Sequence, residues 1–114
     1  MQKLGTHLLV ELSGCNCRAL NDAVLIENIT TDAAIASGAT ILSKHFHRFQ
    51  PQGVSGVVVI AESHLTIHTW PEYGYAAIDI FTCGDKCSPY DAAELMSQGL
   101  DSSRMEIREY VRGF

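Results

Sequence analysis

The hydrophobic and polar positions of this chain fall into short blocks that predict six strands. The block at 54–62 is almost entirely apolar, as expected for a strand at the centre of a sheet. In the last block, Met105, Ile107 and Val111 are interspersed with charged residues, which predicts a strand with one buried face. The six predicted strands are residues 7–12, 40–49, 54–62, 65–70, 75–82 and 105–111.

Two further segments have the spacing of helices. The segment 21–37 has apolar residues three and four apart, with Asn21 as a suitable N-cap and Gly38 as a stop signal. The segment 88–99 begins with Ser88-Pro89, which places an N-cap residue before a proline at the first helical position. The chain therefore contains two predicted helices, one after the first strand and one before the last.

The predicted order is strand, helix, four strands, helix, strand. Four consecutive strands with tight connections require antiparallel pairing. Two helices on one face of that sheet give an α+β two-layer sandwich, formed as a single domain over residues 1–114. The other face of the sheet has no predicted element left to cover it, so we expect two copies of the chain to associate through that face.

Composition and charge exclude several classes of partner. The chain has 114 residues, of which 46% are hydrophobic and 18% charged, as is typical of a folded globular domain. Its formal net charge is −5 and it contains no basic run, so we expect no nucleic acid partner. The longest apolar run, residues 57–61, is far shorter than the ~20 residues of a membrane-spanning helix, so no membrane association is expected.

The four cysteines form two close pairs, Cys15 with Cys17 and Cys83 with Cys87. No secretory signal precedes them, so we expect reduced thiols and a cytoplasmic location. Together with paired histidines, these thiols offer zinc-binding residue types, although their spacing does not match a standard finger or ribbon. A non-catalytic metal-binding module is therefore one alternative. Nucleophilic catalysis by a serine is another, without the usual G-x-S-x-G motif.

A third alternative arises at Glu62-Ser63, directly after the most apolar predicted strand. A serine in a strained turn can attack the preceding carbonyl and convert the peptide into an ester. A base that removes the serine α-proton then drives β-elimination, breaks the chain and leaves a pyruvoyl group on the new N-terminus. That ketone can form a Schiff base and act as an electron sink without an added cofactor. Because Glu-Ser dipeptides are common, the residues alone leave the three alternatives open.

A longer motif distinguishes them. The stretch SGVVVIAESHLTIHTWPEYGYAAIDIFTCG, residues 55–84, resembles the family of small prokaryotic S-adenosylmethionine decarboxylase proenzymes. The segment LGTHLLVEL at 4–12 and the HFH at 45–47 ahead of PQGVS at 51–55 resemble the same family. The resemblance covers nearly the whole chain, and only the region after residue 90 is generic.

The resemblance implies that the proenzyme cuts itself. The cleavage site would lie between Glu62 and Ser63, and Ser63 would become the pyruvoyl cofactor, covalently part of the chain. The products would be a β chain of residues 1–62 and an α chain of residues 63–114. The enzyme is thus expected to start as a zymogen and to activate itself.

The resemblance also assigns roles around that site. His68 matches the family's processing base, which takes the serine α-proton, and Ser55 matches a serine that assists processing. Cys83 matches the proton donor that quenches the carbanion formed when CO2 leaves. The remaining cysteines are predicted to be dispensable: Cys15, Cys17 and Cys87.

The substrate implied by the resemblance carries a sulfonium cation, an adenine and a ribose diol. Aromatic faces attract both the sulfonium and the adenine, and Phe49 and Trp70 resemble the family's aromatic positions. Glu72 is predicted to accept the ribose hydroxyls. His47 and His64 are given no catalytic role.

The sequence therefore predicts a pyruvoyl-dependent lyase that decarboxylates S-adenosylmethionine for spermidine biosynthesis. The expected assembly is a homodimer of processed protomers, with two α and two β chains and active sites shared between the copies. A pyruvoyl-dependent arginine or ornithine decarboxylase on the same scaffold is the alternative, because relatives of this family have changed substrate while keeping the self-cleavage apparatus.

Overall fold

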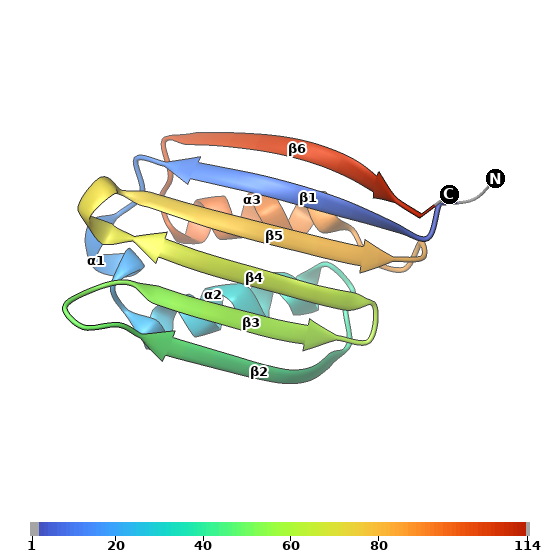
Figure 1. Cartoon of the computed structure of the whole chain (residues 1–114), viewed down its shortest axis with the longest axis horizontal. Coiled ribbons are helices and arrows are strands. Elements are labelled where there is room, and N and C mark those ends of the chain that lie inside the picture. The colour runs from blue at the N-terminus through green and yellow to red at the C-terminus, as the bar shows by residue number, and fades with distance from the viewer. Residues whose placement is uncertain (1–2, 114) are drawn as a thin grey trace.

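The computed structural model describes residues 3–113, which fold into one six-stranded sheet with helices on one side (Figure 1). Every strand pairs with its neighbours in antiparallel fashion. The order across the sheet is β2-β3-β4-β5-β1-β6, so the first strand lies between the fifth and the sixth. The strands are β1 Gly5–Ser13, β2 Ile41–Arg48, β3 Val54–Ile60, β4 Ser63–Trp70, β5 Tyr75–Cys83 and β6 Arg104–Arg112.

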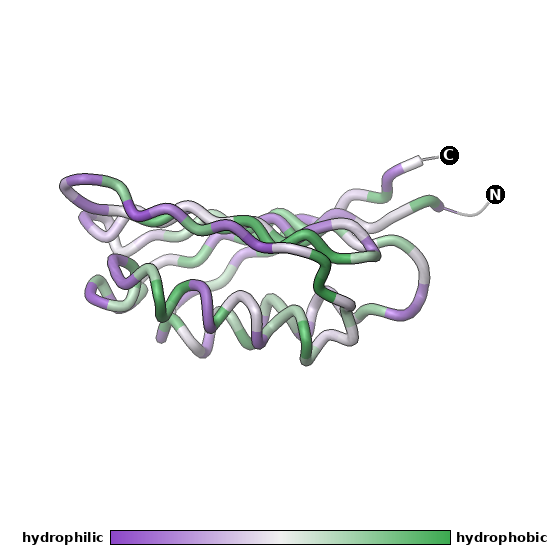
Figure 2. The backbone as a smooth tube through the Cα atoms, turned by 90° about the horizontal axis from the view of Figure 1, so that it is seen from below, coloured by the Kyte–Doolittle hydropathy of each residue, from purple (hydrophilic) through white to green (hydrophobic). Residues whose placement is uncertain are grey.

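The two long helices, α2 and α3, form the second layer. Helix α2 spans Ala23–Ala36 and helix α3 spans Pro89–Gly99, and both pack on the same face of the sheet (Figure 2). This arrangement confirms the predicted α+β two-layer sandwich. The buried core between the layers comes mainly from alternate strand positions and from the inner faces of the helices: Leu8, Val10, Leu12, Ile26, Val58, Ile60, Leu65, Ile67, Ile78, Ile80, Ala92 and Met96.

The start of the first helical region differs from the prediction. A separate four-residue helix, α1 at Cys17–Leu20, precedes α2 and is capped by the side chain of Asn16. Asn21 ends α1, and the Asp22 carboxylate instead caps α2 by accepting from the Leu25 amide. Two suitable capping residues stand side by side here, so the pattern alone selects the wrong one. A short 3-10 helix, η1 at Pro71–Tyr73, also joins β4 to β5.

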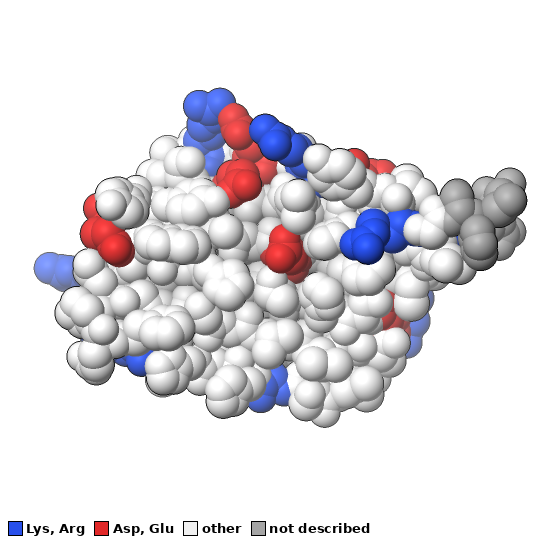
Figure 3. Space-filling model, in the orientation of Figure 1, with Lys and Arg blue, Asp and Glu red and all other residues white. Residues whose placement is uncertain are grey.

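The second face of the sheet carries no helix among residues 3–113. Figure 1 looks onto this face, with the helices behind the strands, and Figure 3 shows its surface in the same orientation. Charged side chains gather toward the β6 edge, whereas the surface over β3 and β4 is mostly uncharged. None of the helices in the described part of the chain is long and apolar enough to cross a membrane.

Candidate active site

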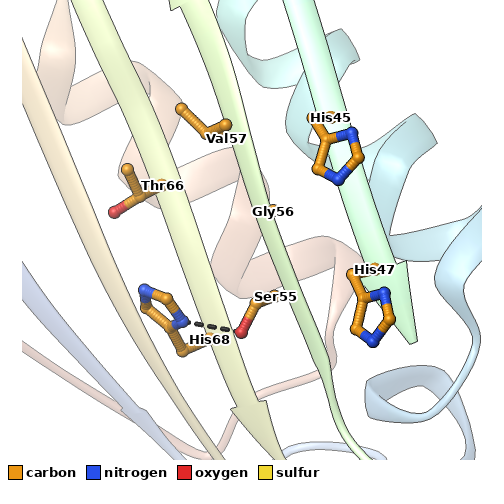
Figure 4. Close-up of a pocket in the computed structure, with 7 residues that line it drawn as sticks. All are labelled: His45, His47, Ser55, Gly56, Val57, Thr66 and His68. Carbon is orange, nitrogen blue, oxygen red and sulfur yellow. Dashed lines mark hydrogen bonds between the residues drawn. The ribbon is translucent and has the colours of Figure 1, made fainter. Parts of the chain in front are cut away.

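A serine and a histidine meet on the open face of the sheet. Ser55 on β3 and His68 on β4 are direct partners in the β3–β4 register. The Oγ of Ser55 lies 2.8 Å from Nδ1 of His68, which is a hydrogen bond between the two side chains (Figure 4). Because strand pairing fixes both backbones, this pair is positioned by the fold rather than by a flexible loop.

The Ser55–His68 pair lies in a shallow depression beside the histidines of β2. His47 is the partner of Ser55 across the β2–β3 pair, and His45 is the partner of Val57. Figure 4 shows the two imidazoles on the same face as the Ser55–His68 pair. The depression is lined by His45, His47, Ser55, Gly56, Val57, Thr66 and His68.

The residues predicted to bind substrate lie at this same end of the sheet. Phe49 follows β2, and its ring packs edge-on against the His47 ring with the centroids 4.6 Å apart. Trp70 ends β4 and packs on Tyr75 at 5.4 Å. Glu72 lies in η1, two positions after Trp70. Phe49 and Trp70 remain 45% and 38% exposed, so both rings have surface left to contact a ligand.

The predicted cleavage site lies at the opposite end of β4, where the β3–β4 turn ends. Ser63 has a backbone φ of 142°, in a region that residues other than glycine rarely adopt. The Cys83 amide, at the end of β5, donates a 2.8 Å hydrogen bond to the carbonyl oxygen of Glu62. The carbonyl that Ser63 would have to attack is therefore already held by a hydrogen-bond donor.

The side chain of Glu62 is also held firmly. One carboxylate oxygen accepts a 3.1 Å hydrogen bond from the Thr40 amide, and the other lies 3.5 Å from the Lys86 ammonium. The hydrogen bond from Thr40 is the main cause that lowers the pKa of the Glu62 carboxyl, and the charge of Lys86 acts in the same direction. Glu62 is thus an ionised side chain with two fixed partners, although its side chain is only 11% exposed.

Two groups of candidate residues therefore form, one at each end of β4. Ser63 and His68 are five positions apart on the same strand, which corresponds to roughly 16 Å between their Cα atoms. The structure brings Glu62, Ser63 and Cys83 together, and it separately brings Ser55 and His68 together with the aromatic residues and Glu72 at their end. Within one chain, His68 does not reach Ser63.

The thiols differ in their surroundings. All four cysteines are free, and Cys83 is exposed at the end of β5. Cys87 is half-buried, and burial raises the pKa of its thiol, with the negative charge of Glu62 adding to the effect. Within residues 3–113, no three His, Cys, Asp or Glu side chains converge in a way that could hold a metal ion.

Comparisons with known proteins show the family to which the chain belongs. The family model for S-adenosylmethionine decarboxylase matches residues 6–113. The chain belongs to the S-adenosylmethionine decarboxylase family. It is 54% identical to the S-adenosylmethionine decarboxylase proenzyme of Caldanaerobacter subterraneus and 53% identical to that of Clostridium tetani, over 99% of this chain and 91% and 90% of theirs. The crystal structure of the adenosylmethionine decarboxylase of Aquifex aeolicus superposes with a TM-score of 0.94 at 35% identity, covering 100% of this chain and 94% of that one.

Membership of the S-adenosylmethionine decarboxylase family confirms the resemblance seen in the sequence. The sequence did not predict two residues that lie near the cleavage site, Thr40 and Lys86. Thr40 is 22 positions before Glu62 and contacts it only through its backbone amide, which leaves no trace in a sequence pattern. Lys86 follows the motif-bearing stretch and reads as an ordinary surface lysine. Neither position carries a signal that reasoning from one sequence could have used.

Proposed function

We propose that this chain is a self-processing, pyruvoyl-dependent decarboxylase of S-adenosylmethionine. One observation carries the proposal: a serine with a strained backbone follows a carbonyl that already accepts a hydrogen bond from a fixed amide. Membership of the family supports the same reading, and the relatives named above are proenzymes by name. The product would supply aminopropyl groups for spermidine synthesis in the cytoplasm.

The cleavage begins at the Glu62–Ser63 peptide. The Ser63 hydroxyl attacks the Glu62 carbonyl carbon, and the Cys83 amide stabilises the negative charge that develops on the carbonyl oxygen. Transfer of the acyl group from nitrogen to oxygen gives an ester. Removal of the Ser63 α-proton then drives β-elimination, which releases the main-chain carboxylate of Glu62 as the new C-terminus of residues 1–62. Hydrolysis of the resulting dehydroalanine releases ammonia and leaves the pyruvoyl ketone.

The base for the α-proton has to come from a second copy of the chain. His68 of the same chain is roughly 16 Å from Ser63 along β4, beyond direct proton transfer. Two copies can pack with their open sheet faces together, related by a two-fold axis that runs between the sheets and perpendicular to the strands. This axis reverses the strand direction, so the Ser63 end of one copy lies over the Ser55–His68 end of the other. The mostly uncharged surface over β3 and β4 favours such packing (Figure 3). The proposed assembly is therefore a homodimer with two composite sites.

The composite site also explains where the substrate-binding residues lie. Phe49, Trp70 and Glu72 stand at the Ser55–His68 end of their own chain, so in the dimer they face the Ser63 and Cys83 of the other. The aromatic rings attract the adenine and the sulfonium, and the Glu72 carboxylate accepts hydrogen bonds from the ribose hydroxyls.

Turnover would use two groups at the Ser63 end of β4, the pyruvoyl group at residue 63 and the Cys83 thiol. A pyruvoyl group at residue 63 supplies a ketone that withdraws electrons from a covalently attached amino acid. The exposed Cys83 thiol returns a proton to the substrate carbon that has lost CO2. An arginine or ornithine decarboxylase would keep the cleavage residues, but its substrate has no ribose hydroxyls for Glu72 to bind.

Two measurements test the proposal. The intact mass of the purified protein should correspond to two fragments, residues 1–62 and a pyruvoyl-bearing fragment that begins at position 63. CO2 release should then be observed from S-adenosylmethionine and not from arginine or ornithine. A single uncut chain would refute the cleavage, whereas cleavage with CO2 release from arginine or ornithine alone would replace the proposed substrate.

A further inference from the structure

Two groups from separate parts of the chain, the Lys86 ammonium and the Thr40 amide, converge on the side chain of Glu62. The Lys86 ammonium lies 3.5 Å from the Glu62 carboxylate and donates a 3.2 Å hydrogen bond to the Thr40 hydroxyl. Thr40 in turn donates its amide to the Glu62 carboxylate at 3.1 Å and accepts the Ala61 amide on its carbonyl at 2.8 Å. The lysine therefore closes a ring of contacts around the residue that precedes the predicted cleavage site.

The side chain of Lys86 is exposed, but contacts with the end of α2 restrain its backbone. It lies in the loop between β5 and α3, and the amide of Ser88 in this loop donates a 2.9 Å hydrogen bond to the Ser37 carbonyl. Gly38 passes so close that a Cβ there would lie 3.0 Å from the Lys86 carbonyl oxygen. The end of α2 thus fixes the point from which the lysine side chain reaches Glu62.

Glu62 is therefore held through two groups, its main-chain carbonyl and its side-chain carboxylate. On one side, the Cys83 amide donates to the Glu62 carbonyl oxygen at 2.8 Å. On the other side, the Glu62 side chain is held by Thr40 and Lys86. Attack by a neighbouring hydroxyl depends on the angle at which it approaches the carbonyl carbon, so a small rotation of the Glu62 carbonyl slows the reaction.

We propose that Lys86 is a positioning residue for self-cleavage. It acts through the Glu62 carboxylate and keeps the carbonyl of Glu62 in line with its hydrogen-bond donor while the Ser63 hydroxyl attacks. Lys86 touches neither the reacting atoms nor the substrate. The inference rests on the proposed self-cleavage and adds to it a residue that lies outside the motif.

The test is the rate of cleavage of freshly translated proenzyme, followed by intact mass over time. Lys86→Met keeps the length of the side chain and removes its charge, and we expect it to slow cleavage by about two- to fivefold, the range for a partly exposed ion pair. Lys86→Arg restores a cation of similar reach and should return the rate to near that of the unchanged chain. Lys44→Met is the matched control, because Lys44 also forms an ion pair, 3.2 Å from Glu27, but away from the cleavage site.

A second readout separates positioning from general stability. Thermal unfolding is compared for uncut Ser63→Ala chains with and without Lys86→Met, and decarboxylation is expressed per cleaved chain. A lysine needed only for folding would lower the melting temperature and both rates together, whereas a positioning residue lowers the cleavage rate alone.

The outcomes remain distinguishable from failure of the proposed function. If Ser63→Ala still yielded both fragments, the cleavage assignment itself would be wrong. If Ser63→Ala stayed intact while Lys86→Met was cut at the unchanged rate, only the role of Lys86 would be overturned. Lys86→Arg that cleaved as slowly as Lys86→Met would also overturn it, since the positioning depends on the charge.

Discussion

The backbone amide of Cys83 donates a 2.8 Å hydrogen bond to the carbonyl oxygen of Glu62. This contact joins the end of β5 to the turn between β3 and β4, so the residue proposed to donate a proton during turnover also holds the peptide proposed to break. The two steps therefore share one corner of the sheet, and substitutions there should separate them only when the backbone is left in place.

Ser63→Ala is expected to leave a single uncleaved chain, because alanine has no oxygen to form the ester. The methyl side chain keeps the same backbone strain, with φ at 142°, so the local fold should be retained. Intact mass after long incubation provides the measurement. Recovery of the two normal fragments from this variant would rule out Ser63 as the nucleophile.

Coexpression of two inactive proenzymes tests the shared site. Ser63→Ala chains lack the nucleophile and His68→Ala chains lack the base, so each alone should stay uncut or be cut very slowly. In a mixed dimer, one site combines the intact Ser63 of one chain with the intact His68 of the other. Fragments should then appear, and only from the His68→Ala chains, which intact mass identifies.

The control for coexpression is each variant expressed alone at the same total concentration. Absence of fragments from the mixture, with mixed dimers demonstrated by differently tagged chains, would contradict the shared site. So would a stable monomer with full activity in light scattering.

Cys83→Ala should still cut itself at least partly, since the amide that holds the Glu62 carbonyl is unchanged. Decarboxylation by the cut enzyme should fall by ~10²–10⁴-fold, the usual worth of a general acid. The measurement is CO2 release per cleaved chain. Cys17→Ala is the control, since Cys17 is exposed at the start of α1, and it should behave like the unchanged enzyme.

Glu72→Gln should weaken binding of S-adenosylmethionine by roughly tenfold to a hundredfold, because a neutral amide accepts the ribose hydroxyls less well than a carboxylate. Titration of the cut enzyme with a non-reactive substrate analogue measures the effect. Glu94→Gln, on the exposed side of α3, removes an equivalent charge elsewhere and should leave the affinity unchanged. Equal affinities for Glu72→Gln and the unchanged enzyme would contradict the role of Glu72. Together with faster CO2 release from arginine than from S-adenosylmethionine, they would favour the arginine or ornithine alternative.

The fold was largely predictable, because alternation at period two marks the strands and turn residues separate them. The core positions of β4, Leu65 and Ile67, follow this alternation and are fully buried. Helix α1 was missed because four residues are too few to show a helical period. The pairing of β1 with β5 and β6 links residues far apart in sequence, and only the folded sheet reveals it.

The candidate site was predictable only as a set of residues. The family motif indicates Ser55, Ser63, His68 and Cys83, but it does not say which of them meet. Ser63 and His68 lie at opposite ends of β4 because the strand is eight residues long. The contact of Thr40 with Glu62 depends on how the chain turns into β4, which no local pattern encodes. Motifs identify chemistry, whereas register and distance decide which chain supplies each part.

The strand order has a consequence for the lifetime of the protein if it is cut as proposed. A break between residues 62 and 63 assigns β1, β2 and β3 to one fragment and β4, β5 and β6 to the other, yet β1 lies between β5 and β6, and β3 stays paired with β4. The fragments are thus interleaved, and neither can leave without breaking backbone pairing in the sheet. Once unfolded, however, they would have to find each other again in solution, so refolding would become concentration-dependent where the uncut chain refolds alone. The durability of the cut protein would then depend on how slowly it unfolds rather than on its equilibrium stability.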